Sequence, residues 1–251
     1  MYKAEILLDS INPAGSRLTT MRVTMPRFIL AEFNTHRVFS RNAASSRAIS
    51  IKRRIEQVEQ NPVFPLEWGL DQKGMSASNV LDQESAIDAV CEWKDAANYA
   101  VQQAKALQRL GLHKQIVNRI LEPFTWVTVI VSSTEWENFF HLRISPMAQP
   151  EIRRTAELMK EALDASVPVQ LKWGEWHVPL ARDPWVAAGR LARVSYETEG
   201  KSDQEDKDLA HRLANSGHWS PFEHIAQALR TGYNNNFHLT WTQWRALVEL
   251  E

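Results

Sequence analysis

A run of β-branched and aromatic residues at 124–131, Phe-Thr-Trp-Val-Thr-Val-Ile-Val, constrains the fold of this chain more than any other feature. Such residues favour extended backbone, and a largely apolar run of this kind is typical of a strand buried on both faces of a sheet. The alternating pattern at 19–25 predicts a second strand and residues 2–8 a third, with turn residues 12–16 between them. The chain therefore needs a sheet in which 124–131 is a central strand.

Helical patterns occupy most of the remaining chain. Apolar residues recur at helical spacing over 83–111 and predict a long helix. Strands and long helices that do not alternate regularly indicate an α+β fold with a mixed or antiparallel sheet. A chain of 251 residues can form one large domain or two small ones, and it can bury a sizeable core. Shorter helices are predicted at 26–37, 51–60, 113–121, 132–143, 150–165 and 203–216, a polar stretch at 38–50, and loops at 61–82 and 167–190.

The charge pattern narrows the possible functions. Lys and Arg number 29 and Asp and Glu 30, so the formal net charge of −1 gives no global signal for nucleic acid or a membrane surface. The charges are nevertheless uneven, because residues 1–54 are strongly basic and residues 195–251 are acidic. A basic N-terminal part is compatible with a bound anionic ligand and equally with a solvated basic face.

The single cysteine, Cys91, excludes a disulfide within the chain and a cysteine-based metal site. One free thiol fits a reducing, cytoplasmic compartment. Because Cys91 lies in the helical pattern of 83–111, we predict that it is a small core residue. No secretory signal or membrane span is expected, since the longest apolar run, near 126–131, is far shorter than a span.

Residues 35–47, Thr-His-Arg-Val-Phe-Ser-Arg-Asn-Ala-Ala-Ser-Ser-Arg, concentrate hydrogen-bond donors at the end of the predicted 26–37 helix. Three guanidiniums and several hydroxyls suit a phosphate or a planar polar ligand, because Arg presents a rigid fork of donors. His36 can bind an oxyanion or transfer protons near neutral pH. A surface loop with ordinary Asx and Ser turns would explain the same composition.

Two further polar clusters follow. Asn138 and Leu142 are one helical turn apart beside Arg143, so a helix would present them together; the alternative is an amphipathic helix with a solvated Arg. Residues 217–224, Gly-His-Trp-Ser-Pro-Phe-Glu-His, hold two His and one Glu. Their spacing is not that of a helical zinc site and Pro221 interrupts the helix turn, so we expect no metal.

These clusters resemble the flavin-dependent thymidylate synthase family. The family signature, Arg-His-Arg followed by seven residues and Ser, is similar to the string His36-Arg37-x-x-Ser40-x-Asn42-x-x-Ser45-x-Arg47. Residues 119–123 with 138–153 resemble a second conserved region, and 192–196 with 217–224 a third. The third region precedes the signature in the family and follows it here. The resemblance therefore implies a permuted form of the family's fold, as a single domain over residues 1–251.

The resemblance also implies roles for single residues. Arg143 and His218 would act beside the reacting bases. In the family these groups come from several subunits, which implies a homotetramer with shared sites. The residues that would bind flavin are His36, Arg37, Val38, Ser195 and Ser220, and those that would bind the nucleotide are Ser45, Ser46, Arg47, Arg119, Asn138, Leu142 and Arg143.

The chain departs from the family pattern at several positions. Each charged hydrogen bond lost to an anionic ligand is worth ~1.5–3 kcal/mol, so these departures affect how flavin and nucleotide bind. Thr35 stands where the family has the first Arg of its signature, Ala43 where it has an acidic residue, Ala48 where it has an aromatic one, Ser132-x-Thr134 where it has a flavin-binding Asn-x-Arg, and Met147 where it has a His.

By resemblance, the function is C5 methylation of dUMP to dTMP. Methylene-tetrahydrofolate would donate the carbon, and FAD reduced by NADPH would supply the hydride. The expected partner is dUMP, with no membrane and no nucleic acid. One alternative is a dUMP hydroxymethylase on the same fold. The other is a nucleotide- or nucleic-acid-binding protein that has lost flavin. The basic N-terminal part of the chain is the observation that suggests this alternative.

Overall fold

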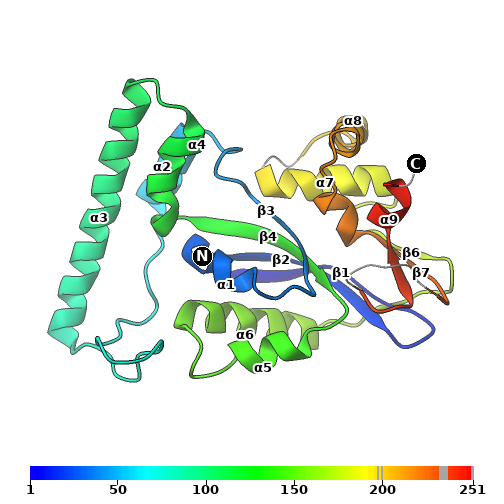
Figure 1. The fold of residues 1–251 in the computed structure, drawn as a ribbon, viewed down its shortest axis with the longest axis horizontal. Coiled ribbons are helices and arrows are strands. Elements are labelled where there is room, and N and C mark those ends of the chain that lie inside the picture. Colours follow the sequence, from blue (N-terminus) through cyan, green and yellow to red (C-terminus); the bar gives the residue numbers. More distant parts are fainter. Residues whose placement is uncertain (197, 199, 232–236, 250–251) are drawn as a thin grey trace.

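A mixed sheet forms the centre of the molecule, for which the computed structural model describes residues 1–196, 198, 200–231 and 237–249, without the Ser195 side chain (Figure 1). Its strand order is β3-β4-β2-β1-β5, in which only β5 runs parallel to its neighbour. The α+β fold with a mixed sheet is therefore confirmed, as is the predicted hairpin of β1 and β2. The strands are Lys3–Ile11 (β1), Arg17–Pro26 (β2), Ser40–Ala43 (β3), Trp126–Ser133 (β4) and Val169–Gln170 (β5).

A smaller antiparallel sheet, ordered β6-β7-β8, and the helices surround this frame. Its strands are Trp176–His177 (β6), Ala226–Ala228 (β7) and Trp241–Gln243 (β8). The α-helices are Leu30–Phe33 (α1), Ile51–Gln60 (α2), Gln83–Arg109 (α3), Lys114–Val117 (α4), Glu137–Arg143 (α5), Pro150–Asp164 (α6), Pro184–Tyr196 (α7), Asp203–Asn215 (α8) and Trp244–Val248 (α9), and the 3-10 helices are Arg27–Ile29 (η1), Asn118–Phe124 (η2) and Ser220–His224 (η3).

Strand β4 is buried on both faces, as its sequence predicts. Val127, Val129 and Val131 pack with β2 against α5 and α6, below the sheet in Figure 1. Ile130 points the other way and joins a cluster under α7, which includes Leu191. Each such side chain contributes ~1.5–3 kcal/mol when it is fully buried. The central strand thus joins two cores, and residues at its ends are held between helices on both sides.

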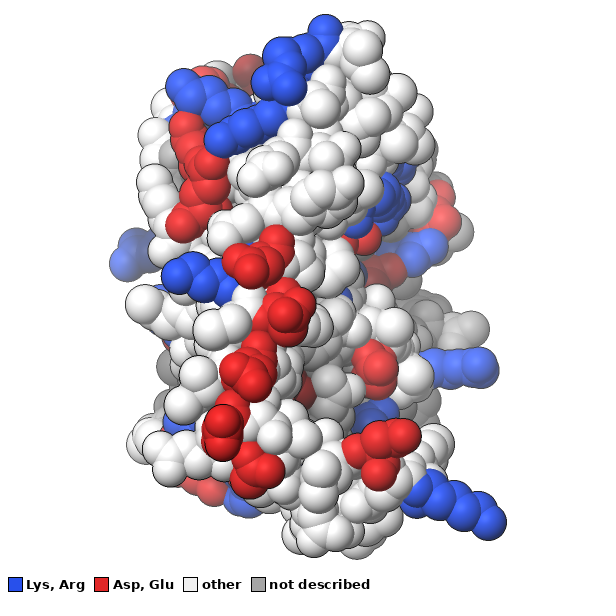
Figure 2. Space-filling model, turned by 90° about the vertical axis from the view of Figure 1, so that its left-hand side faces the viewer, with Lys and Arg blue, Asp and Glu red and all other residues white. Residues whose placement is uncertain are grey.

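Helix α3 lies at one end of the molecule, where it packs on α2 and η2 (Figure 1). Its buried positions include Ala97, Val101 and Ala104, whereas Cys91 is exposed. The prediction of Cys91 as a core residue is wrong, because the apolar stripe of α3 lies on another side of the helix. Figure 2 shows a row of acidic side chains on this end of the molecule, over the helix that carries the exposed residues Glu84, Asp88, Glu92 and Asp95. Such a surface does not attract nucleic acid.

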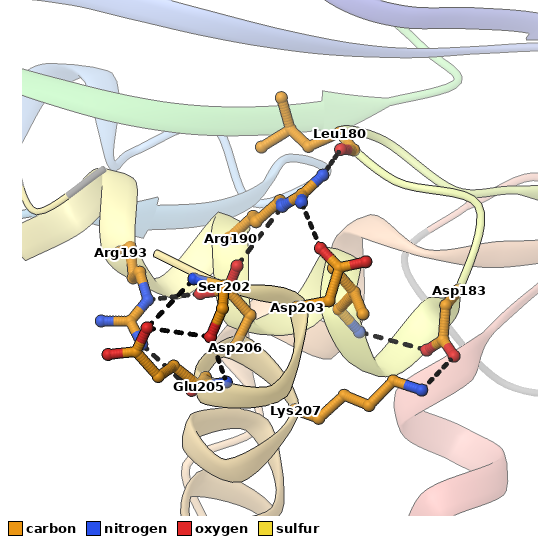
Figure 3. Close-up of polar contacts among 10 residues, drawn as sticks. Leu180, Asp183, Arg190, Arg193, Ser202, Asp203, Glu205, Asp206 and Lys207 are labelled. Carbon is orange, nitrogen blue, oxygen red and sulfur yellow. Dashed lines mark hydrogen bonds and ion pairs between the residues drawn. The ribbon is translucent and has the colours of Figure 1, made fainter. Parts of the chain in front are cut away.

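Helices α7 and α8 pack closely because of one glycine. A Cβ on Gly189 would lie 2.1 Å from the backbone oxygen of Asp206. The Asp206 carboxylate, only 1% exposed, accepts from Arg193 and, at 3.3 Å, from Nε of Arg190 (Figure 3). The capping box of Ser202 with Glu205 begins α8 beside these ion pairs. The ion pairs of Asp206 with Arg190 and Arg193 fix α7, the helix that carries the Ala-Arg-Val-Ser sequence of the third region.

Several local predictions need correction. The predicted 26–37 helix is only η1 and α1, which end at Phe33. The predicted helix start at 132–135 is wrong, because residues 132–133 end strand β4 and α5 begins only at Glu137. The predicted 113–121 helix is the short α4 followed by η2, and α7 begins inside the predicted loop 167–190. Strand β3 lies in a stretch predicted to be irregular, and it forms by pairing with β4. In the described part of the chain, no helix is long and apolar enough to cross a membrane.

Candidate active site

Two predicted site residues meet although they lie far apart in the sequence. Arg143, the last residue of α5, donates from Nε to Nε2 of His36 at 2.9 Å. Its Nη2 group donates to Oγ1 of Thr35 at 3.2 Å. The His36 ring is 8% exposed and packs edge-on against Phe139 with ring centroids 4.8 Å apart. The first and second conserved regions therefore form one cluster at the ends of α1 and α5.

The environment of His36 sets its protonation. Burial, together with the guanidiniums of Arg143 and Arg41, lowers its pKa from 6.5 to about 4. His36 is therefore neutral at pH 7, and Nε2 is the acceptor of the Arg143 bond. The backbone oxygen of His36 accepts from Nη1 of Arg41 at 2.7 Å, which fixes the loop that carries the ring. His36 is thus a support for Arg143 rather than a proton carrier near neutral pH.

The residues that follow His36 face opposite ways. Arg37 and Val38 are exposed, whereas the Phe39 ring is buried against Phe33 and Phe139. Within the described part of the chain, the Arg37 guanidinium has no hydrogen bond or ion pair. The buried aromatic residue therefore anchors the segment, and a free cation and an apolar side chain are left for a ligand.

The loop between β3 and α2 carries the predicted nucleotide-binding residues Ser45, Ser46 and Arg47. Ser45 is half-buried. Ser46 is buried, and the Ser46 hydroxyl donates to Glu122 of η2. Arg47 is exposed, and its guanidinium has no partner among the described residues. The same Glu122 accepts from Arg119 at 2.9 Å. The structure therefore brings Ser46 and Arg119 together through a residue that the sequence analysis missed.

Arg119 lines an open cleft of about 420 Å³ beside α1. The cleft also contains Asn34, the residue immediately before the Thr35–His36 pair. Glu122 and Arg27 form a second ion pair in its wall, with Nε of Arg27 3.0 Å from Oε1 of Glu122. The sequence signal for Glu122 was its spacing of three residues from Arg119, which suits an ion pair on a helix.

Helix α5 also carries the other predicted residues of the second region. Asn138 and Leu142 are both exposed on it, while Arg143 turns inward to His36. Asn138 makes no side-chain hydrogen bond within the described residues. Asn138 and Leu142 are therefore both open to solvent, and the prediction that Arg143 points the same way is wrong, because its guanidinium binds His36.

The third region approaches the first at one point. Ser220 of η3 donates to Oδ1 of Asn42 at 3.5 Å, and Nδ2 of Asn42 donates to the Leu191 oxygen at 3.1 Å. His218 is exposed, with Nδ1 2.9 Å from the Ser216 hydroxyl, and no contact among the described residues joins it to Arg143. Ser195 lies in α7, and its side chain is outside the described part of the structure.

The position where the family has a flavin-binding Asn is occupied by a buried serine. The Ser132 hydroxyl lies 2.6 Å from the Thr20 hydroxyl and 2.8 Å from Nδ1 of the His224 ring. Thr20 continues the chain to Nε2 of His177 at 2.8 Å, and Nδ1 of that ring lies 2.9 Å from the Ser10 hydroxyl. Ser132 therefore belongs to a buried polar chain, a row of hydrogen-bonded side chains between the two sheets, and it is not exposed to solvent.

The fold and these clusters define an α+β protein in which a half-buried arginine, Arg143, donates to a buried histidine, His36. A sequence model of the thymidylate synthase complementing protein family matches residues 17–169, which is more than half of the chain. The chain belongs to this family and is a flavin-dependent thymidylate synthase-like transferase. A search of curated proteins by sequence finds no match.

Solved structures with a similar fold include the UMP/dUMP methylase PolB from Streptomyces cacaoi. Its complex with 5-Br UMP aligns with a TM-score of 0.54 at 17% identity, over 65% of this chain and 88% of that chain. Its complex with 5-Br dUMP aligns at 0.47 and 18%, over 59% of this chain and 66% of that one. Thymidylate Synthase X from Helicobacter pylori, solved with FAD and dUMP, aligns at 0.41 and 16% over 58% and 67%. At this level of identity, the first alignment shows a shared fold.

Proposed function

We propose that the protein transfers a one-carbon unit to C5 of dUMP and reduces it to a methyl group with FAD as cofactor. The observation that carries the proposal is the bond between Arg143 and His36, which joins two signature regions of the family 107 residues apart. Family membership and the pyrimidine nucleotides in the PolB and Thymidylate Synthase X structures support the substrate class.

The residues of the first region suit an anionic nucleotide. Arg37 and Arg47 offer guanidiniums that no described residue neutralises, and Arg143 keeps Nη1 free after its bonds to His36 and Thr35. Arg143 would hold the nucleotide phosphate or stabilise negative charge that develops on the pyrimidine. Its fixed orientation is useful there, because a preorganised donor need not rearrange during the reaction.

The same region can accommodate flavin. The exposed Val38 side chain offers an apolar contact beside the free Arg37 cation, and Ser220 lies next to Asn42 of the signature. FAD, when bound, supplies the hydride of the reaction. The protein's part is to hold the rings in order and to exclude water.

The remaining parts of the proposal follow from the resemblance. Methylene-tetrahydrofolate and NADPH are the proposed co-substrates, and the chain is taken as one domain with a permuted order of regions. Because His218 and Arg143 are not joined within one chain, we propose that a homotetramer completes the site. A single free thiol supports a cytoplasmic location.

One observation favours a related product. Ser132 is fully buried in the polar chain, so it cannot take the flavin contact that the family makes at this position. If no hydride were transferred from flavin, water would add to the methylene group on C5 instead, and the product would be the C5-hydroxymethyl nucleotide. The hydroxymethylase is therefore the second candidate.

The visible spectrum of the purified protein after FAD addition and desalting tests the proposal. A retained flavin band that shifts when dUMP is added supports a site shared by both ligands. A colourless protein that still binds dUMP by calorimetry contradicts the flavin part and supports a nucleotide-binding protein.

A further inference from the structure

The loop that carries Ser45 and Arg47 has little regular structure of its own but is held by surrounding side chains. Its backbone makes one local turn, in which the Ala48 N–H donates to the Ser45 oxygen at 2.9 Å. The backbone oxygens of Ala44, Ser46, Ala48 and Ile49 accept bonds from side chains outside the loop. Nη1 of Arg27 donates to Ala44 at 3.1 Å, and Nζ of Lys114 to Ala48 at 3.3 Å.

Asn118 makes the innermost of these contacts. Its side chain is fully buried, and Nδ2 donates to the Ser46 oxygen at 2.7 Å and to the Ile49 oxygen at 3.0 Å. One turn later on η2, Glu122 accepts from the Ser46 hydroxyl. One short helix therefore holds both the backbone and the side chain of the same serine.

The direction of these bonds determines what the loop presents. Because the backbone oxygens of Ser46 and Ile49 turn inward to Asn118, the Arg47 side chain is exposed. Its guanidinium has no partner in the described part of the chain. Because the backbone of this loop is already fixed, it loses little conformational entropy when a ligand binds. Such preorganisation raises the affinity for the ligand.

We propose that Asn118 is a positioning residue, which holds the loop 44–49 in the form that directs Arg47 to the phosphate of the bound nucleotide. This inference rests on the proposed function for the identity of the nucleotide. Asn118 touches neither ligand nor reacting atoms. It acts through Ser46, Ile49 and the backbone between them.

The test compares two buried asparagines. Asn12 is equally enclosed, and its Nδ2 also makes two bonds, to the oxygen and hydroxyl of Thr240 at 3.1 and 2.9 Å, but it lies at the β1–β2 turn. Asn118→Ala removes two side-chain hydrogen bonds, and Asn12→Ala removes four, because Oδ1 of Asn12 also accepts from the backbone N–H groups of Ala14 and Ser16. Calorimetry measures the Kd of dUMP and of deoxyuridine, which lacks the phosphate, with wild type and both variants.

We expect Asn118→Ala to raise the Kd of dUMP about tenfold and to change that of deoxyuridine much less. Asn12→Ala should leave both values unchanged. An unchanged dUMP affinity in Asn118→Ala, or equal losses for dUMP and deoxyuridine, overturns the inference while the proposed function stands. If the wild type binds no dUMP, both are overturned.

Hydrogen exchange of the wild type keeps the test decisive if Asn118→Ala does not fold. We expect the Ala48 amide to be protected before any ligand is added, because the loop is already ordered. Exchange of this amide at the rate of an unstructured peptide overturns the inference.

Discussion

Nε of Arg143 donates to Nε2 of His36 at 2.9 Å, and this bond fixes which ring nitrogen of the imidazole is the acceptor and the direction of the guanidinium. A neutral imidazole with a low pKa is a good acceptor for a cation. Among the described residues, Nη1 of Arg143 has no partner, so it can bind a ligand. The bond explains how a chain that lacks the first Arg of the family signature still orders the second region, because Thr35 in its place accepts from the same guanidinium.

Replacing Arg143 by Lys tests the importance of this geometry. Lys keeps the charge, but its single ammonium nitrogen does not reproduce the planar fork that reaches His36 and Thr35 from two different nitrogens. We expect Arg143→Lys to lower kcat/KM for dUMP by ~10–100-fold, equivalent to one or two charged hydrogen bonds. Arg154→Lys on α6 is the matched control, since within the described part of the chain Arg154 pairs only with Glu157 and Glu161 on its own helix. Equal kcat/KM for Arg143→Lys and wild type would contradict the role given to the fork.

The buried polar chain between the sheets predicts how stability depends on pH. Burial lowers the pKa of His224 from 6.5 to about 3. Burial also lowers the pKa of His177 to about 3, against the opposing effect of Asp9. The unfolded chain binds these protons near pH 6.5 and the folded chain only near pH 3. The stability present above pH 6.5 is therefore lost as the pH falls through this window, by up to ~1.4 kcal/mol per pH unit for each ring.

Urea unfolding at pH 7 and pH 5 measures this dependence. We expect a clearly lower midpoint at pH 5, and a smaller drop in His224→Asn than in wild type. His141→Asn is the control, because His141 is exposed on α5 and should not change the pH slope. A midpoint that does not change between the two pH values would show that these rings are not buried and neutral.

Glu122 is predicted to matter for stability as well as for the site. Its Oε1 accepts from Arg119 and from Arg27, whose side chain is only 11% exposed. Glu122→Gln leaves the Arg27 cation enclosed without its counter-charge, so we expect a loss of ~1–3 kcal/mol in the free energy of unfolding. Glu157→Gln, in an exposed pair with Arg154, should cost little. The two variants are compared by chemical denaturation, and equal stabilities would refute the prediction.

The close packing of α7 on α8 makes Gly189 sensitive to a single methyl group. A Cβ there would lie 2.1 Å from a backbone oxygen that cannot move without displacing α8. We expect Gly189→Ala to cost ~1–3 kcal/mol and to lower Tm by several degrees. Ala96→Gly, on the exposed side of α3, is the control because it is the reverse substitution. It should lower the stability only by the amount that a glycine ordinarily costs inside a helix. A Tm for Gly189→Ala equal to that of wild type would show that the helices are not in contact at this point.

The sequence predicts those elements whose pattern is strong and local. The run at 124–131 is the central strand, and the long helical pattern at 83–111 is α3. Strand β3 could not be predicted, because Ser40, Arg41, Asn42 and Ala43 are not typical strand residues and form a strand only by pairing with β4. The exposure of Cys91 depends on which side of α3 faces α2, and a single helix pattern does not decide this.

The candidate site is divided in the same way. Arg143 and His36 could be singled out by residue type and by resemblance, but their contact spans 107 residues and depends on the tertiary fold. Asn118 and Glu122 carry no motif at all. Their importance follows from the position of η2 against the loop 44–49, which only the structure shows.

The mass of the nucleotide product tests the central claim most directly. The protein is incubated with dUMP, methylene-tetrahydrofolate, NADPH and FAD, and the nucleotide is analysed by mass spectrometry. The account predicts a product heavier than dUMP by one CH₂ group, whose formation requires FAD. A product one oxygen heavier than this methylated nucleotide would identify a hydroxymethylase. Unchanged dUMP would contradict one-carbon transfer to this nucleotide.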